Sequence, residues 1–179
     1  MTAMTLYQAS IPPMRRSLAN LAAFFAKSAD HLAAQGVPES DWLGASLAPD
    51  MFTLTRQIQL ACDAAKFAAA RLSASSAPVM EDVETSVAEL SDRIARTIAY
   101  LDDVAPSAID GREDAEIEVN FPNASIYFTG SSYLRDFGMP NLFFHVTTAY
   151  AIMRHKGAPI GKMDFLGPIE FVLHDAVPA

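Results

Sequence analysis

The sequence predicts a mostly α-helical protein, an antiparallel four-helix bundle with a β-hairpin between the third and fourth helices. Four segments repeat apolar residues every three or four positions, which is the spacing of one helix face. Over residues 116–129 the period changes to two, as in a pair of strands. A length of 179 residues and a hydrophobic content of 51% suit one core. Residues 1–179 are therefore expected to form a single domain.

The first long helix is expected over residues 11–35. Ser10 is a suitable N-cap, prolines occupy the first turn, and Gly36 can end the helix. A short helical turn over residues 40–47 carries Trp42, the one tryptophan of the chain. Its large ring is expected to close one end of the core.

The second long helix is expected over residues 51–73, with Asp50 as its N-cap. Its apolar positions form one seam: Met51, Leu54, Ile58, Ala61, Ala65, Ala68 and Leu72. Ser86 and Glu89 form a capping box that starts a third helix, expected to run to Asp102.

Residues 116–129 are expected to form a hairpin that turns at Pro122-Asn123. A lone hairpin is marginal in water, so it should lie across the helices or pair with a second chain. The fourth helix is expected from Pro140 to residue 155 or 156 and is apolar around nearly its whole circumference. Such a helix needs the hairpin or a second subunit to cover its outer face. The tail over 158–168 should fold back without regular structure, because it holds two prolines and two glycines.

The net charge and the cysteine content indicate which binding partners and which cellular compartment to expect. A net charge of -8 repels phosphate backbones, so nucleic acid and anionic membrane surfaces are not expected partners. No stretch approaches the ~20 apolar residues of a membrane span. The single cysteine, Cys62, allows no internal disulfide and favours a cytoplasmic location. We interpret it as a small buried residue and not as a nucleophile.

Four histidines, His31, His145, His155 and His174, decide whether metal chemistry can be predicted. A metal site on one helix needs ligands three or four residues apart, so that both imidazoles leave the same face. The closest pair, His145 and His155, lies roughly 15 Å apart along a helix and about 80° around it. The spacing therefore predicts no metal and no other cofactor. The roles of His31, His155 and His174 are left open.

Four strings of residues resemble a bacterial family described as domain of unknown function nineteen-ninety-three, within the DinB/YfiT-like four-helix-bundle superfamily. The strings are LAPDMF at 47–52, QIQLACDAAK at 57–66, PNLFFHVTTAY at 140–150 and RHKGAPIGKMDFLG at 154–167. The resemblance covers nearly the whole chain, and the last string is its most specific part.

This resemblance implies an antiparallel bundle, usually dimeric, in which three histidines often hold a divalent metal. One ligand comes from the second helix and two come from the fourth, and some members are thiol-dependent transferases or isomerases. The present sequence departs from that pattern, because its second helix has no histidine. Its fourth helix has His145 and His155 where a pair four residues apart is needed. The superfamily's metal is therefore not expected here.

Six side chains are candidates for a pocket: Arg56, Gln59, Asp63 and Lys66 on the second helix, and His145 and Tyr150 on the fourth. The four on the second helix form a polar stripe, which is either a solvated face with an Asp63–Lys66 pair or the wall of a pocket shared with His145. His145 is either a core histidine with a hydrogen-bond partner or a general base. Tyr150 either packs in the core or joins that pocket.

Two hypotheses of different class follow. The first is a metal-free bundle that binds a small molecule or a partner as a homodimer, without chemistry of its own. The second is an enzyme of the superfamily's transferase or isomerase type that uses His145 and Asp63, with Tyr150, as acid and base.

Overall fold

The computed structural model of the protein describes residues 3–170. Its body consists of four long helices: α1 (Leu6–Ala34), α3 (Leu54–Ser73), α4 (Val87–Asp102) and α6 (Met139–His155). Around the bundle, α1 contacts α4, α4 contacts α3, α3 contacts α6, and α6 contacts α1. The predicted fold class, a mostly helical bundle with a hairpin between the third and fourth long helices, is confirmed.

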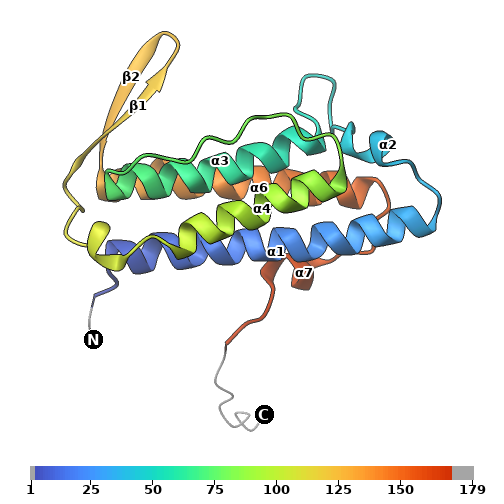
Figure 1. The fold of residues 1–179 in the computed structure, drawn as a ribbon, viewed down its shortest axis with the longest axis horizontal. Coiled ribbons are helices and arrows are strands. Elements are labelled where there is room, and N and C mark those ends of the chain that lie inside the picture. The colour runs from blue at the N-terminus through green and yellow to red at the C-terminus, as the bar shows by residue number, and fades with distance from the viewer. Residues whose placement is uncertain (1–2, 171–179) are drawn as a thin grey trace, which may run out of the picture.

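The direction of each helix follows from the connections between them. In Figure 1, α1 and α6 run one way, and α3 and α4 run the other way. The neighbours α1/α4 and α3/α6 are therefore antiparallel, whereas α3 and α4 are parallel. The cause is the segment 74–86, here named the crossover, which returns along the length of α3 before α4 begins.

One core fills the bundle. The predicted seam of α3 is buried from Leu54 onward, and its alanines Ala61, Ala65 and Ala68 have no exposed surface. Such small side chains let a neighbouring helix approach closely, which suits the extensive contact between α3 and α6. The short helix α2 (Glu39–Leu43) places Trp42 against Phe25, with ring centroids 5.6 Å apart, and so closes one end of the core as predicted.

Two helix starts differ from the prediction. Helix α1 begins at Leu6 and not near residue 11, because Thr5 and Gln8 form a capping box in which each side chain accepts the other's backbone N–H. Ser10, the expected cap, lies inside the helix and donates its hydroxyl to the carbonyl of Leu6 at 2.7 Å. Helix α3 begins after Thr53, which caps it in place of Asp50.

The predicted capping box of Ser86 and Glu89 is confirmed at the start of α4. The predicted hairpin is also confirmed, as β1 (Glu116–Phe121) paired antiparallel with β2 (Ala124–Thr129). It projects sideways from the bundle near one end, away from the helices, instead of lying across them (Figure 1). Its aromatic side chains pack on the segment that follows, since the ring centroid of Phe128 lies 5.9 Å from that of Tyr133.

The fourth helical region starts earlier than Pro140. It comprises α5 (Gly130–Tyr133), a π-helical turn η2 (Leu134–Gly138) and α6 without a break. The π turn ends at Gly138, two residues before Pro140, whose missing N–H interrupts the regular α-helical hydrogen bonds. Gly130 is needed at the start, because a Cβ there would lie 2.2 Å from the carbonyl oxygen of Arg112.

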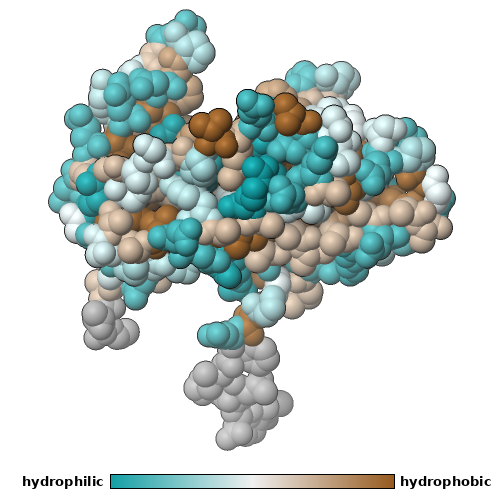
Figure 2. All heavy atoms as spheres, viewed as in Figure 1, coloured by the Kyte–Doolittle hydropathy of each residue, from teal (hydrophilic) through white to brown (hydrophobic). Residues whose placement is uncertain are grey.

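The tail was expected to lack regular structure, and this is wrong for one turn, α7 (Lys162–Leu166), where Asp164 accepts the N–H of Gly161 at 2.7 Å. The tail does fold back onto the body, since Phe165 stacks on Phe24 with ring centroids 6.3 Å apart. Within residues 3–170, no helix combines the length and the apolar character needed to cross a membrane. The face in Figure 2 mixes isolated hydrophobic groups with hydrophilic ones, and α6 lies behind it.

Candidate functional site

A network of buried ion pairs centres on Arg93 of α4, whose side chain has no exposed surface. Its Nη1 lies 3.0 Å from Glu84 Oε1, and its Nη2 lies 3.0 Å from Asp63 and 2.9 Å from Asp82. Nη1 also donates to the carbonyl of Glu81 at 2.9 Å. Arg93 therefore joins α4 both to α3 and to the crossover.

The predicted polar stripe of α3 belongs to this network. Lys66 Nζ lies 2.8 Å from Asp63 Oδ1, and Gln59 donates to Glu84 at 2.9 Å. Arg56 donates to Gln59 and pairs with Asp82. The Lys66 side chain is 3% exposed and Gln59 is 4% exposed, so the stripe is not a solvated face. The crossover and α4 cover it.

The charges of the network balance, with three cations, Arg56, Lys66 and Arg93, against three carboxylates, Asp63, Asp82 and Glu84. Burial acts to raise the pKa of Glu84, but hydrogen bonds from Arg93 and Gln59 outweigh it and hold that pKa below its usual value. The network thus favours the ionised form of Glu84 and fastens the crossover to the bundle.

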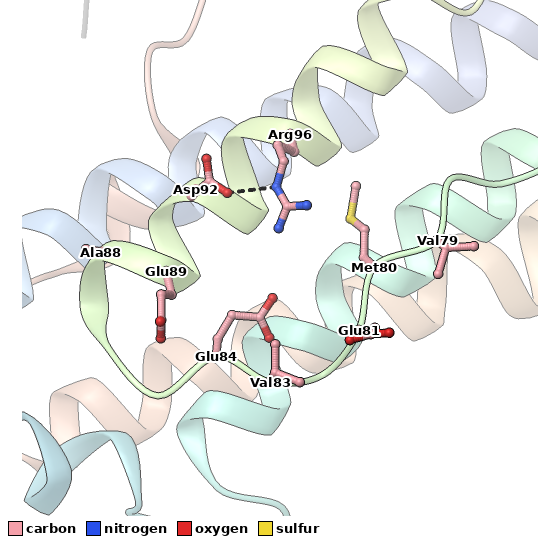
Figure 3. A pocket seen from close by; sticks show the side chains of 9 residues that line it. All are labelled: Val79, Met80, Glu81, Val83, Glu84, Ala88, Glu89, Asp92 and Arg96. Carbon is pink, nitrogen blue, oxygen red and sulfur yellow. Dashed lines mark ion pairs between the residues drawn. The ribbon is translucent and has the colours of Figure 1, made fainter.

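A cavity of about 660 Å³ lies beside the network, between the crossover and the first turns of α4 (Figure 3). Three of the four acidic side chains that line it already have structural partners. Glu84 binds Arg93, Glu89 accepts the N–H groups of Thr85 and Ser86, and Asp92 pairs with Arg96 at 2.7 Å. These three acidic side chains therefore stabilise the crossover and the start of α4.

A second pocket, here named the hairpin pocket, lies between α3, β1 and the π turn and has a volume of about 210 Å³. Its walls include the rings of Phe67, Phe121, Tyr133 and Phe137. Polar groups enter from α3, which contributes Asp63 and Arg71, and from Asn120 and Asn141. A mostly apolar pocket with a few convergent polar groups is the usual form of a small-molecule site.

Arg71 is held by its neighbours in this pocket. Its Nη1 donates to the hydroxyl of Tyr133 at 3.1 Å, and its guanidinium carbon lies 5.4 Å from the ring centroid of Phe67 and 5.7 Å from that of Tyr133. Burial raises the pKa of Tyr133, although Arg71 opposes this shift. Tyr133 therefore stays a neutral phenol whose oxygen accepts the Arg71 hydrogen bond.

His145 forms its hydrogen bond with neither the network nor the hairpin pocket but with Gln57 of α3, with 2.8 Å between Nδ1 and Oε1. The Gln57 amide nitrogen donates to the carbonyl of Phe52, so its oxygen faces the imidazole as an acceptor. Nδ1 of His145 must therefore carry the proton in the neutral ring. Burial, followed by the charge of Arg56, lowers the pKa of His145. These contacts match the interpretation of His145 as a core histidine with a partner on a neighbouring helix.

Tyr150 lies apart from the other candidates. Its ring packs edge-on against Phe24 and Phe165, with centroids 5.8 Å from each. Cys62 is also buried, and burial raises its pKa to about 12. It is therefore a thiol inside the core and not a thiolate, as the sequence interpretation held.

The donor set does not fit the superfamily's metal. Helix α3 has no histidine, and the side chain that faces His145 from α3 is the amide of Gln57. Across the described residues, no three His, Cys, Asp or Glu side chains lie close enough together to hold an ion. His174 lies outside the described residues.

The six predicted site residues therefore occupy three places. Arg56, Gln59, Asp63 and Lys66 come together in the network, whereas His145 and Tyr150 each pack elsewhere. The sequence analysis missed Arg71 and Arg93. Arg93 had a detectable signal, because it occupies the apolar seam of α4 between Leu90 and Thr97.

Comparison with known proteins agrees with the fold. The family described as Domain of unknown function (DUF1993) matches residues 6–166. A crystal structure of a DinB family member protein from Shewanella denitrificans is 37% identical to this chain, with a TM-score of 0.87. The match covers 94% of this chain and 96% of that one. No curated protein matches the chain.

Proposed function

This chain belongs to the DUF1993 family and is related to a DinB family protein, and from that premise we propose that it is a metal-free bundle that binds a small molecule as a homodimer. The hairpin pocket is the single observation that carries the proposal. It combines aromatic walls with the guanidinium of Arg71 and the amides of Asn120 and Asn141. Its volume, about 210 Å³, is roughly that of seven waters at ~30 Å³ each, which suits a compound of one ring or two fused rings.

The position of the pocket supports a role in binding. Phe137 and Gly138 belong to the π turn, and such turns occur frequently at functional sites. The opposite wall comes from β1 of the projecting hairpin. Two elements that interrupt the regular bundle thus build one pocket on the surface of α3.

The outer face of α6 supports the dimer. Phe143 and Phe144 are 42% and 56% exposed there, and their neighbours around one shallow depression are Leu47, Pro140, Thr147, Thr148 and Ala151. None of these residues carries a charge. Two copies of a chain with net charge -8 repel each other, so an uncharged apolar face is where they can meet. A two-fold axis through this face would cover both copies equally.

The contacts favour binding over the acid–base alternative. His145 reaches α3 at Gln57, whereas Asp63 is held by Lys66 and Arg93. Gln57 and Asp63 are six residues apart, roughly 9 Å along the helix and about 120° around it. His145 therefore contacts a different face of α3 from the one that carries Asp63, and the two groups have different partners.

The test uses indole, a neutral compound with one fused ring system, and ligand-observed NMR. Ala64 lines the hairpin pocket and Ala23 lies on the exposed side of α1. We expect Ala64→Met to weaken indole binding at least fivefold, because the longer side chain fills the pocket, while Ala23→Met leaves binding unchanged. Equal binding to both variants, or none to the unaltered protein, would refute the proposal. Metal analysis of the untagged protein should find less than about a tenth of an equivalent of zinc, nickel or iron.

A further inference from the structure

We propose that the ligand of the hairpin pocket is a small organic carboxylate with an aromatic or apolar body, and that Arg71 binds its carboxylate. This inference rests on the proposed function and adds the chemical class of the ligand. Arginine presents its N–H donors in a planar fork that matches the two oxygens of a carboxylate. The pocket places such a fork beside four aromatic rings.

The positive charge of Arg71 is not neutralised by an ion pair within the described residues. Within residues 3–170, no carboxylate lies within ion-pair distance of it, and its one hydrogen bond goes to the neutral Tyr133. The other cations of α3, Arg56 and Lys66, have carboxylate partners. Because the neighbouring network is balanced, Arg71 adds one net positive charge to the pocket, in a chain that is otherwise strongly acidic.

The nearby acid does not cancel this charge. Asp63 also lines the pocket, but its Oδ1 is bound by both Lys66 and Arg93. Asp63 and Arg71 are eight residues apart, roughly 12 Å along α3. A carboxylate bound at Arg71 would therefore lie at the opposite end of the pocket from an already neutralised acid.

Arg71 is also fixed in position before a ligand arrives. Its guanidinium lies over the rings of Phe67 and Tyr133, and Tyr133 accepts one of its five N–H groups. Of the polar side-chain atoms fully buried in the described part of the chain, those without a partner are Arg93 Nε and Tyr100 Oη. The remaining donors of Arg71 are therefore open to solvent and available to a ligand. A preorganised cation binds an anion with less loss of side-chain entropy.

The apolar part of the ligand follows from the walls. Phe67 is 40% exposed and Phe121 is 43% exposed, so both rings offer uncovered surface beside the guanidinium. A flat ring placed between them gains burial and stacking. The polar amides of Asn120 and Asn141 can hydrogen-bond a substituent. A one-ring carboxylate can contact the rings with its apolar part and Arg71 with its carboxylate.

The test compares three compounds of the same shape: benzoate, neutral benzamide and cationic benzamidine. Isothermal titration should show benzoate binding at least tenfold more tightly than either of the others. Arg71→Gln should reduce this preference to less than twofold. The matched control is Arg154→Gln, because Arg154 is an exposed arginine of α6 that forms no ion pair in the described chain. That variant should keep the full preference.

Two results would overturn the inference: benzamide or benzamidine binding as tightly as benzoate, or an undiminished preference in Arg71→Gln. If Arg71→Gln fails to fold, Arg71→Lys replaces it, with benzoate binding expected to fall at least threefold because lysine lacks the fork. Unchanged benzoate affinity in that variant would likewise overturn the inference. Indole binding separates the two proposals. If indole binds and benzoate has no advantage, the carboxylate inference fails while the small-molecule site stands.

Discussion

Arg93 and Glu84 form an ion pair whose side chains are both buried, 0% and 5% exposed, with 3.0 Å between Nη1 and Oε1. A buried charge keeps its place only when other groups compensate it. Here the compensation comes from α3 and from the crossover, so one arginine fixes three parts of the chain relative to each other.

Replacement of Arg93 should therefore cost much more stability than replacement of an exposed arginine on the same helix. Arg93→Met leaves Glu84 and Asp63 without their shared partner, and we expect a loss of about 3 to 5 kcal/mol in the free energy of unfolding. In the control, Arg96→Met, an exposed pair with Asp92 is lost, at a cost below about 1 kcal/mol. Urea unfolding of both variants measures the difference. Equal losses would show that the network does not hold the fold together.

Stability should also fall as the pH is lowered through the range in which His145 would take up a proton. Burial lowers its pKa below 6.5, so the unfolded chain binds this proton more readily than the folded one. Above pH 6.5, His145 is neutral in both states and does not affect the free energy of unfolding. As the pH falls below 6.5, protonation of the unfolded chain lowers this free energy, until the pH reaches the folded-state pKa. The slope of this dependence is at most about 1.4 kcal/mol per pH unit.

Urea unfolding between pH 7.5 and 5.5 measures this effect. His145→Gln can still donate a hydrogen bond to Gln57 but cannot titrate, so its stability should change less over that interval. The same pH dependence of the free energy of unfolding in the variant and the unaltered protein would show that His145 does not cause the effect.

Cys62 should be unreactive in the folded protein. Burial raises its pKa to about 12, so almost no thiolate exists at neutral pH. A thiol-specific disulfide reagent should modify the chain only after unfolding in urea, at a rate that follows the unfolding transition. Rapid modification of the native protein would show that Cys62 is accessible and would contradict its interpretation as a buried, unreactive thiol.

The proposed dimer predicts a sedimenting mass twice that of the 19.3 kDa chain. Phe144→Glu introduces a charge on the outer face of α6 and should yield monomers, because two copies would then face each other with like charges. Met163 is 64% exposed on α7, so Met163→Glu serves as the matched control and should remain dimeric. A monomer in the unaltered protein at micromolar concentration would remove the dimer.

Local sequence signals predicted the parts of the fold that depend on neighbours in the chain. The capping box of Ser86 and Glu89 marked the start of α4, and the change of period marked the hairpin. The start of α1 was misplaced because Thr5 and Ser10 both satisfy the cap rule, and only the folded helix shows which side chain accepts a backbone N–H. The π turn before Pro140 has no apolar period of its own.

The site was less predictable because its contacts join distant segments. The pair of Asp63 and Lys66, three residues apart, belonged to one of the two interpretations of the stripe, and the structure contains this pair. Gln57 and His145 are 88 positions apart, and Arg71 and Tyr133 are 62 apart, so the sequence gives no sign of either contact. Burial of the α3 stripe likewise depends on the path of the crossover, which composition identified only as a loop.

The most direct test of the binding proposal is to locate indole on the protein by intermolecular NMR contacts between its protons and assigned side chains. The proposal predicts contacts with Phe67 and Phe121 in the hairpin pocket, and none with Phe143 or Phe144. Contacts confined to the outer face of α6, with the hairpin pocket untouched, would contradict it.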